Sequence, residues 1–398
     1  MTISKLYRTV PIAIIFISNM IFGQSYMDNL KFKPIAENVS QRAITSIIKD
    51  QQEIVWIGTQ GDGIYSFNGL ELKNYRHEWG NEKTLDNSGV NTIFLDSNNN
   101  LWVGTDVGLN LYHRNLDQFV PVKLNSQNSK VQIKAIGETD RNTLLIGTHG
   151  SGVLELNTTN QKVIKVKIIA YDSIEKLQIN EIKTTPRGAI LFGSNIGLLK
   201  YNSLTNELDY AKFTTSRQSE EIKNPIESIL TKLDGSIWLG TTSEGLIEIS
   251  TSPTNYFEFK SYNITNKRIL SLETNTEGAI FCGTENDGLI ILDRNGAVKS
   301  FKFNKSDTDG IKSNSIWSIF IDDGNRIWVG YFNQGVDIYD KENERFKSIE
   351  SIPNKDQSLF SKSVTSITQD NQGRFWIGIS DGGVDVYDPK EETFTHLL

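Results

Sequence analysis

The stretch IWVGYFNQGVDIYD, residues 327–340, decides the fold because its pattern occurs eight times in this 398-residue chain. Each copy has three apolar residues, a glycine, a short polar turn, a second glycine and another apolar segment. The first glycines follow one another at intervals of 43 to 48 residues, a spacing typical of units that stack or surround an axis. These glycines are Gly58, Gly104, Gly147, Gly193, Gly240, Gly283, Gly330 and Gly378.

The residues around each glycine predict four short strands per repeat. The apolar triplet before it, such as Ile327, Trp328 and Val329, indicates a strand that is covered on both faces. Further apolar columns, represented by Ile44 and Ile47, predict a strand before this one, and two more follow the second glycine. Four antiparallel strands in about 40 to 50 residues describe one blade of a β-propeller. The fold class is therefore all-β, a propeller spanning residues 25–398.

Tryptophan occupies the middle of the triplet in five repeats. Because this position lies inside a strand that neighbouring blades cover, we expect the rings to pack in the core and not to bind a ligand. The five residues are Trp56, Trp102, Trp238, Trp328 and Trp376.

Two arrangements of the eight blades are compatible with the pattern. We favour one eight-bladed ring, because a blade left alone would expose its apolar faces, and the eighth repeat has its own predicted fourth strand at Thr393–Leu397. The segment KFKPI, Lys31–Ile35, reads as an outer strand before the first repeat and could close a ring. In the alternative arrangement seven blades close and the eighth begins a second domain.

The N-terminus indicates export. Lys5 and Arg8 precede an apolar run, Val10–Phe22, which ends at the small residue Gly23. This order is typical of a signal peptide, here residues 1–24, and predicts a periplasmic or secreted protein; an uncleaved anchor is the alternative. No later segment is apolar for the roughly 20 residues that a helix needs to span a membrane, so no span is expected after removal of the signal.

Composition excludes several classes of function. The net charge is −7 without runs of like charge, which argues against nucleic acid as a partner. A single cysteine, Cys282, excludes an internal disulfide framework. The repeated glycines precede no helix and so do not form a phosphate loop, and no set of side chains has the spacing of metal ligands. We expect neither a cofactor nor a metal.

Two stretches resemble the two-component regulator propeller repeat: FKPIAENVSQRAITSIIKDQQEIVWIGTQGDGIYSFNG, residues 32–69, and SIWSIFIDDGNRIWVGYFNQGVDIYD, residues 315–340. The resemblance implies the exported sensor region of a hybrid two-component receptor of Bacteroidetes. Such a region detects a ligand, commonly products of polysaccharide breakdown, and passes the signal to a cytoplasmic histidine kinase. The family has no catalytic motif to transfer to this sequence.

One face of the propeller is the expected binding surface. Loops that join the second strand to the third, and one blade to the next, emerge there around the central channel. In the seventh repeat Tyr331 and Phe332 stand where most repeats have threonine or serine after the glycine, and Trp317 begins the inner strand. Rings among polar groups suit a sugar, although they could also plug the channel. The candidate ligand-binding residues are Trp317, Tyr331, Phe332, Asn333, His149, Arg268 and Asp106.

These patterns predict a sensing or binding module and not an enzyme. The expected partners are a glycan or other small molecule, together with a membrane histidine kinase or an envelope protein. Two alternatives stay open: an assembly scaffold in the envelope, and a propeller lyase that uses a face histidine such as His149 as acid or base. Because no carboxylate or basic residue forms a recognisable set with His149 in the sequence, no catalytic residue is assigned.

Overall fold

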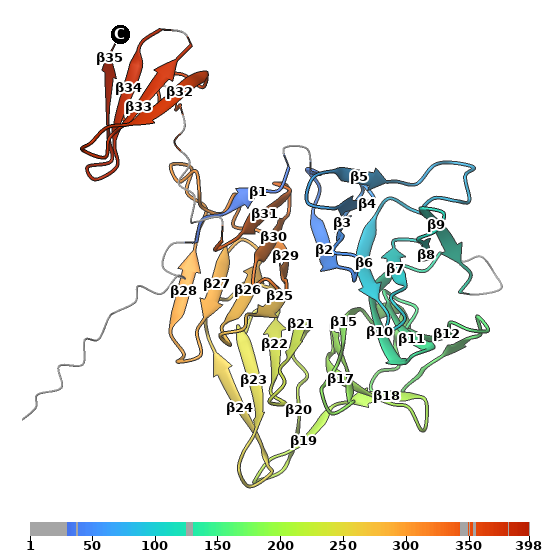
Figure 1. Ribbon diagram of the computed structural model, residues 1–398. Coiled ribbons are helices and arrows are strands. Elements are labelled where there is room, and N and C mark those ends of the chain that lie inside the picture. The colour runs from blue at the N-terminus through green and yellow to red at the C-terminus, as the bar shows by residue number, and fades with distance from the viewer. Residues whose placement is uncertain are drawn as a thin grey trace, which may run out of the picture. The chain divides into compact units, whose positions relative to one another are not determined.

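The computed structural model describes residues 30–36, 39–124, 130–342, 349, 351–352, 356–380 and 382–397. The chain divides into two compact units, Met1–Tyr339 and Asp340–Leu398. All elements in the described residues are β-strands except the short 3₁₀ helix η2, Ile174–Lys176 (Figure 1), which confirms the all-β class. No helix in these ranges is long and apolar enough to span a bilayer. The predicted signal peptide, residues 1–24, lies outside them.

Six blades of the first unit each take four consecutive strands from one repeat. The first three are β2 (Ile44–Lys49), β3 (Val55–Thr59), β4 (Ile64–Phe67) and β5 (Leu72–Tyr75); β6 (Val90–Leu95), β7 (Leu101–Thr105), β8 (Leu109–His113) and β9 (Gln118–Val122); and β10 (Ile133–Asp140), β11 (Thr143–Thr148), β12 (Val153–Asn157) and β13 (Val163–Lys165).

The next three blades follow the same order, with additions around the fourth. They are β15 (Ile179–Thr184), β16 (Ile190–Ser194), β17 (Gly197–Asn202) and β18 (Glu207–Tyr210); β21 (Ile226–Thr231), β22 (Ile237–Thr241), β23 (Leu246–Thr251) and β24 (Phe257–Tyr262); and β25 (Ile269–Thr274), β26 (Ile280–Thr284), β27 (Leu289–Leu292) and β28 (Val298–Phe301). Strand β14 (Lys167–Ile168) pairs in parallel with β18. Strands β19 (Lys212–Thr214) and β20 (Ser219–Glu221) form a separate hairpin.

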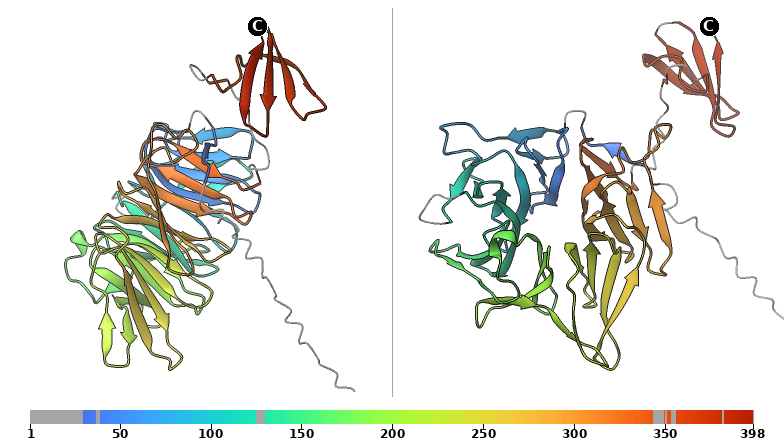
Figure 2. Two further views of the ribbon diagram at one scale, coloured as in Figure 1. Left: turned by 90° about the vertical axis from the view of Figure 1, so that its left-hand side faces the viewer. Right: turned by 180° about the vertical axis from the view of Figure 1, so that it is seen from behind.

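The seventh blade takes its outer strand from the beginning of the chain. It consists of β29 (Ile316–Ile321), β30 (Ile327–Tyr331) and β31 (Val336–Tyr339), with β1 (Lys33–Pro34) antiparallel to β31. Seen from behind in Figure 2, the blue β1 lies beside the orange strands of this blade. The predicted outer strand in KFKPI is therefore confirmed.

The ring closes with seven blades. Each inner strand contacts the next around the circle, and β29 of the seventh blade contacts β2 of the first. At this junction the Ser318 hydroxyl donates to the Ile44 carbonyl oxygen at 2.9 Å, and Lys49 pairs with Asp323. The eight predicted blades are present as eight sheets. The favoured eight-bladed ring is wrong and the seven-bladed alternative is right, because β1 completes the seventh blade and β2 of the first blade already contacts β29 and β30.

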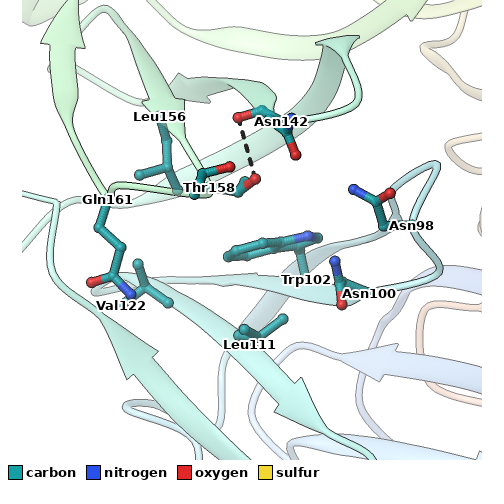
Figure 3. A pocket seen from close by; sticks show the side chains of 10 residues that line it. Asn98, Asn100, Trp102, Leu111, Val122, Asn142, Leu156, Thr158 and Gln161 are labelled. Atoms are coloured by element: carbon teal, nitrogen blue, oxygen red, sulfur yellow. Dashed lines mark hydrogen bonds between the residues drawn. The ribbon is translucent and has the colours of Figure 1, made fainter.

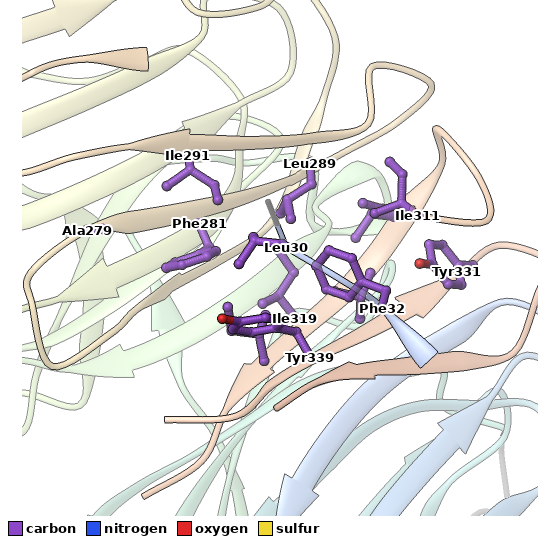
Figure 4. Close-up of a cluster of buried hydrophobic side chains, with 13 residues drawn as sticks. Leu30, Phe32, Ala279, Phe281, Leu289, Ile291, Ile311, Ile319, Tyr331 and Tyr339 are labelled. Carbon is purple, nitrogen blue, oxygen red and sulfur yellow. The ribbon is translucent and has the colours of Figure 1, made fainter. Parts of the chain in front are cut away.

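Apolar side chains anchor the N-terminal segment in the ring. Leu30 and Phe32 are buried in a cluster that also contains Phe281 of the sixth blade and Tyr339 of the seventh (Figure 4). The rings of Phe32 and Tyr339 lie 6.2 Å apart. The segment before β1 thus fills the space between the outer parts of two blades.

The eighth repeat forms a four-stranded sheet in the second unit. Its strands are β32 (Val364–Gln369), β33 (Phe375–Ile379), β34 (Val384–Asp388) and β35 (Thr393–Leu397), in that order. Leu359, Ile377, Ile379 and Tyr387 form its own small core. The predicted fourth strand of this repeat is therefore confirmed, although the repeat is not part of the ring.

The triplet tryptophans of the ring lie in the core, as the sequence predicts: Trp56, Trp102, Trp238 and Trp328 are all buried. The glycine that follows each triplet permits the close approach of the next blade. A Cβ atom at Gly104 would lie 2.6 Å from Cγ2 of Ile133, the first residue of the next inner strand. Glycine is needed there for the space that its missing side chain leaves.

Candidate functional site

A β-bulge at the start of every inner strand directs one side chain into the central channel. In the first blade Ile44 and Ser46 face the consecutive residues Thr59 and Gly58, so Thr45 is the additional residue. The same register shift occurs in the other six blades of the ring. Bulges re-aim side chains in this way. The seven bulge residues all line a central cavity of about 640 Å³: Thr45, Asn91, Lys134, Asn180, Glu227, Leu270 and Trp317.

The bulge residues and the predicted loops meet at one channel mouth. Since all inner strands start at this end, the loops between second and third strands lie at the same end. Asp106, in the loop between β7 and β8, accepts hydrogen bonds from Asn91 Nδ2 at 3.0 Å and Gln132 Nε2 at 2.8 Å. Lys134 in turn donates to Asn91 Oδ1 at 2.9 Å. Burial lowers the pKa of Lys134, an effect that the Asp106 carboxylate opposes.

Arg268 holds a different part of the mouth. Its guanidinium donates to both carboxylate oxygens of Glu227 on the neighbouring blade, at 3.1 and 2.9 Å, and lies 3.8 Å from Glu285. The hydrogen bond to Glu227 raises the pKa of Arg268. A bidentate pair of this kind fixes the orientation of the arginine plane, which remains partly exposed.

The seventh blade contributes an aromatic pair in which Phe332 is exposed and Trp317 is half-buried. The rings of Trp317 and Phe332 lie 5.3 Å apart at 39°, and Phe332 is 45% exposed. Trp317 Nε1 donates to the Ser315 hydroxyl at 3.3 Å, while Asn333 is exposed next to Phe332 in the loop. This pair offers an apolar platform beside polar groups.

Tyr331 does not belong to this surface, and its placement in the candidate site is wrong. It is the last residue of β30, is fully buried in the cluster around Phe32, and donates its hydroxyl to Asp337 Oδ2 at 2.9 Å. The N-terminal segment that completes the blade covers this ring. Because successive side chains along a strand point to opposite sides, Phe332, the next residue, faces solvent.

His149 lies on the mouth but without an acidic partner in the described part of the chain. It is exposed in the loop between β11 and β12, where its Nε2 lies 3.2 Å from Gln178 Nε2. The structure therefore brings together Asp106 with Asn91 and Lys134, and Trp317 with Phe332. His149 and Arg268 occupy the same mouth with other partners.

Three charged residues deeper in the channel were missed by sequence reasoning. Lys183 Nζ lies 3.2 Å from Glu181 Oε1, and this carboxylate raises the pKa of Lys183. Burial raises the pKa of Glu273 to about 7, although the charge of Lys183 opposes the shift. All three residues line the central cavity. The signal was the presence of charged residues at Glu181, Lys183 and Glu273 within the predicted inner strands. No metal-binding group of histidine, cysteine or acidic residues occurs in the described ranges.

Comparison with known families agrees with this architecture. The model of the two-component regulator propeller matches residues 84–107, in the second repeat, and 358–381, in the eighth. Two of the eight repeats of this chain therefore match the two-component regulator propeller model. The matched segments contain the inner and second strands of their blades, where the glycine and the apolar columns of the repeat lie.

Proteins similar to this chain include a histidine kinase and extracellular domains of two-component systems. A curated relative, histidine kinase P4 of Formosa agariphila, is 29% identical over 170 residues, which cover 40% of this chain and 12% of that protein. Two solved structures are extracellular domains of proteins described as hybrid two-component systems of B. thetaiotaomicron. They have TM-scores of 0.64 and 0.63 and identities of 20% and 18%, and cover 93% and 92% of this chain. At these identities the structures establish the propeller fold. The chain spans 49% and 54% of those two structures.

Proposed function

We propose that this chain is an extracytoplasmic ligand-sensing region of a two-component signalling system, and that the ligand binds at the channel mouth. One observation carries the proposal: seven bulges direct seven side chains to one end of the channel, and one of these, Trp317, pairs with the exposed ring of Phe332. A surface of this kind combines shape, hydrogen-bonding groups and an apolar platform, as small-molecule sites do.

A glycan is the ligand class that this chemistry favours. Asn91, Lys134 and Arg268 supply donors for hydroxyl groups, and Trp317 with Phe332 supplies rings on which a sugar can stack. The channel mouth is also polar without a dominant charge, which suits a neutral or weakly charged oligosaccharide. The signal would pass to a histidine kinase, the class to which the curated relative belongs.

Binding without catalysis is the proposed activity. A lyase would need a second acid or base that acts on the substrate together with His149. In the described structure the imidazole of His149 contacts the neutral side-chain amide of Gln178. The carboxyl of Glu273 lines the wall of the channel together with Lys183.

Titration of the protein with a panel of oligosaccharides tests the proposal, followed by calorimetry and tryptophan fluorescence. We expect saturable binding at micromolar to millimolar concentration. Phe332→Ser should weaken it at least tenfold with little change in melting temperature, since the ring is exposed. Tyr256→Ser, which removes a partly exposed ring from the turn before β24, is the matched control. Absence of binding, or equal affinity in Phe332→Ser, would refute the proposed site.

A further inference from the structure

The aspartate that begins the turn between the first two strands of a blade is hydrogen bonded to the triplet tryptophan six residues later. We call this pair the Asp–Trp unit. In the first, second, seventh and eighth repeats the indole Nε1 donates to the carboxylate at 2.8 to 3.0 Å. The four units are Asp50 with Trp56, Asp96 with Trp102, Asp322 with Trp328, and Asp370 with Trp376.

Three of these units hold an arginine. Arg326 Nε donates to Asp322 Oδ2 at 2.7 Å, and its guanidinium carbon lies 5.9 Å from the Trp328 ring. Arg374 contacts Asp370 and Trp376 in the same way. In the first blade the arginine comes from the next blade, where Arg114 Nη1 reaches Asp50 Oδ2 at 2.7 Å.

The fifth blade, which lacks the aspartate, still places a cation beside its tryptophan. Lys232 stands at the aspartate position, and its Nζ lies 5.5 Å from the Trp238 ring centroid. Lysine and arginine are favoured over an indole face by the electron density of the ring. Four of the five triplet tryptophans thus have a cation next to the ring or next to the carboxylate bonded to it.

The second blade is the exception. Asp96 is 5% exposed, and its Oδ2 accepts hydrogen bonds from Trp102 Nε1 at 2.8 Å and Asn100 Nδ2 at 2.9 Å. Its Oδ1 accepts the backbone N–H groups of Asn98 and Asn100, so all four donors are neutral. Within the residues that the structure describes, no cation pairs with this carboxylate or lies over the Trp102 ring. A buried carboxylate without a counter-charge attracts a cation strongly, because little water screens it.

Asn100, four residues after Asp96, stands where Arg326 and Arg374 stand in their repeats and donates to Asp96 as a neutral amide. Strand register identifies the counterpart of Arg114, the arginine that comes from the next blade. Leu111 in β8 is paired with Trp102, and Glu155 in β12 with Leu145; both partners stand two residues before a motif glycine. Three residues further along each strand lie Arg114 and Thr158, which are therefore structural equivalents. The third blade supplies a short hydroxyl where the second blade supplies a guanidinium.

The polar acceptors around the two positions correspond as well. Arg114 Nη2 donates to the Asn99 carbonyl oxygen at 3.3 Å. The equivalent of Asn99 is Asn142, each five residues before its glycine, and the Thr158 hydroxyl donates to its carbonyl oxygen at 3.2 Å. Both blades therefore have the carbonyl acceptor. Arg114 extends past it to Asp50, whereas the shorter side chain of Thr158 ends at it.

A cavity of about 280 Å³ occupies the space between the second and third blades (Figure 3). Figure 3 shows the Trp102 ring in its centre, with Asn100 and Asn98 on one side and Gln161 on the other. The side-chain amides of Asn142 and Gln161 have no hydrogen-bond partner among the described residues. The volume is just below the range of roughly 300 to 1,000 Å³ typical of sites for drug-sized ligands, so it suits one side-chain-sized group.

We propose that this cavity binds the guanidinium group of an arginine side chain or of a small guanidino compound. Asp96 does not itself line the cavity but is hydrogen bonded to the lining residues Trp102 and Asn100, and through them it supplies the counter-charge. Trp102 supplies the aromatic ring, and the side-chain carbonyl oxygens of Asn142 and Gln161 supply further hydrogen-bond acceptors. The cavity is formed by turns that follow the inner strands, whereas the channel mouth lies where these strands begin. This site is therefore separate from the proposed sensing surface and does not depend on it.

Binding of agmatine and of an arginine-containing peptide tests the inference, with citrulline and a citrulline peptide as neutral analogues. We expect calorimetry to detect saturable binding of the guanidinium compounds and at least tenfold weaker binding of the citrulline forms. Binding of agmatine but not of the peptide would assign the cavity to small guanidino compounds. Binding of each of the two would assign it to the guanidinium group as such. Equal affinity for the neutral analogues, or no binding of either guanidinium compound, would overturn the proposal.

Two variants separate the cavity from other anionic patches. Thr158→Arg supplies the guanidinium from the chain itself, as Arg114 does in the neighbouring groove, and should abolish agmatine binding while raising the melting temperature. Thr158→Gln, which adds a polar but uncharged and shorter side chain, is the control and should not raise it as much. Arg114→Thr should open a second site, raise the stoichiometry from one to two, and be restabilised by agmatine more than by citrulline. Unchanged binding in Thr158→Arg would contradict the assignment.

Discussion

Trp56 donates its indole N–H to Asp50 Oδ2 at 2.9 Å, although both side chains are buried. The other oxygen of Asp50 accepts the backbone N–H groups of Gln52 and Ile54, which closes the turn between β2 and β3. One carboxylate therefore fixes the turn, orients the ring in the core and receives Arg114 from the next blade. These contacts lower the pKa of Asp50 although its burial acts in the opposite direction.

Removal of this carboxylate should weaken the first blade. Asp50→Ala leaves the Trp56 indole and two backbone donors without their acceptor, which we expect to lower the free energy of unfolding by about 2 to 3 kcal/mol. Chemical denaturation followed by fluorescence measures the change. Asp172→Ala, an exposed residue whose side chain makes no hydrogen bond in the described structure, should change it by less than about 0.5 kcal/mol. Equal effects of the two substitutions would contradict the structural role of Asp50.

Trp328 should be among the most sensitive positions in the ring, because it joins the last blade to the first. It packs with Ile44 and Tyr65 and lies 6.3 Å from the Phe67 ring. Trp328→Ala should cost about 3 to 5 kcal/mol through the cavity that it leaves. Trp79, which is 95% exposed, provides the control, and Trp79→Ala should leave the melting temperature nearly unchanged. An unchanged melting temperature in Trp328→Ala would show that the column is not part of the core.

Asp337 should make the seventh blade more stable in mild acid. Burial raises its pKa to about 6, although the hydrogen bond from Tyr331 opposes this shift. A carboxyl whose folded pKa lies above its unfolded value of about 3.9 holds its proton more tightly when folded, so stability falls as the pH rises between these values. Asp337→Asn, which retains an acceptor for Tyr331, should be more stable than the parent at pH 7 and lose this pH dependence. Denaturation at pH 5 and pH 7 measures both; equal pH profiles would contradict the shift.

His396 should have the opposite pH dependence, in the sheet of the eighth repeat. Its Nδ1 lies 2.7 Å from Asp385 Oδ1 and its Nε2 lies 2.9 Å from the Asp356 carbonyl oxygen. Two acceptors favour the doubly protonated ring, and the Asp385 hydrogen bond is the main cause of the raised pKa of His396. The stabilisation is complete below the unfolded value of about 6.5 and is lost as the pH rises through the folded pKa. An NMR titration should place the pKa of His396 above the unfolded value of about 6.5, and a pKa at or below that value would refute this.

Phe32 should hold the ring closed. Phe32→Ala removes a buried ring from the cluster between the sixth and seventh blades, at an expected cost of about 3 to 5 kcal/mol. Hydrogen exchange should accelerate in β31, which loses a firmly held partner in β1. Phe303→Ala, at a half-exposed ring, is the control. If hydrogen exchange in β31 is unchanged although the melting temperature is lower, the pairing of β1 with β31 does not depend on Phe32.

The local pattern predicted the blades but not their number in the ring. Every repeat shows the same spacing of apolar residues. This spacing was enough to predict the columns that begin with Ile44 and Ile47 and the burial of Trp56 and Trp328. The ring size depends on which outer strand pairs with β31, and KFKPI is compatible with both arrangements. Only long-range packing distinguishes them.

Prediction of the candidate site failed where neighbouring blades decide exposure. Tyr331 and Phe332 are adjacent aromatic residues in a turn, and no local signal shows that the N-terminal segment covers the first and leaves the second exposed. The cavity beside Trp102 was missed for a related reason. It follows from the replacement of Arg114 by Thr158 at equivalent positions in consecutive blades, which appears only once strand register aligns them.

Closure by β1 also determines when folding can finish. Lys33 pairs with Ile338, 305 positions later, so the last strand of the ring must be available before its first residues find their partner. Until then the growing sheet has an open edge, which is a template for pairing with a second molecule. The closing strand is only two residues long, and Pro34 lacks a backbone N–H, so it is itself a poor template for such pairing. The segment that waits longest for its partner is thus one of the least able to form aggregates while it waits.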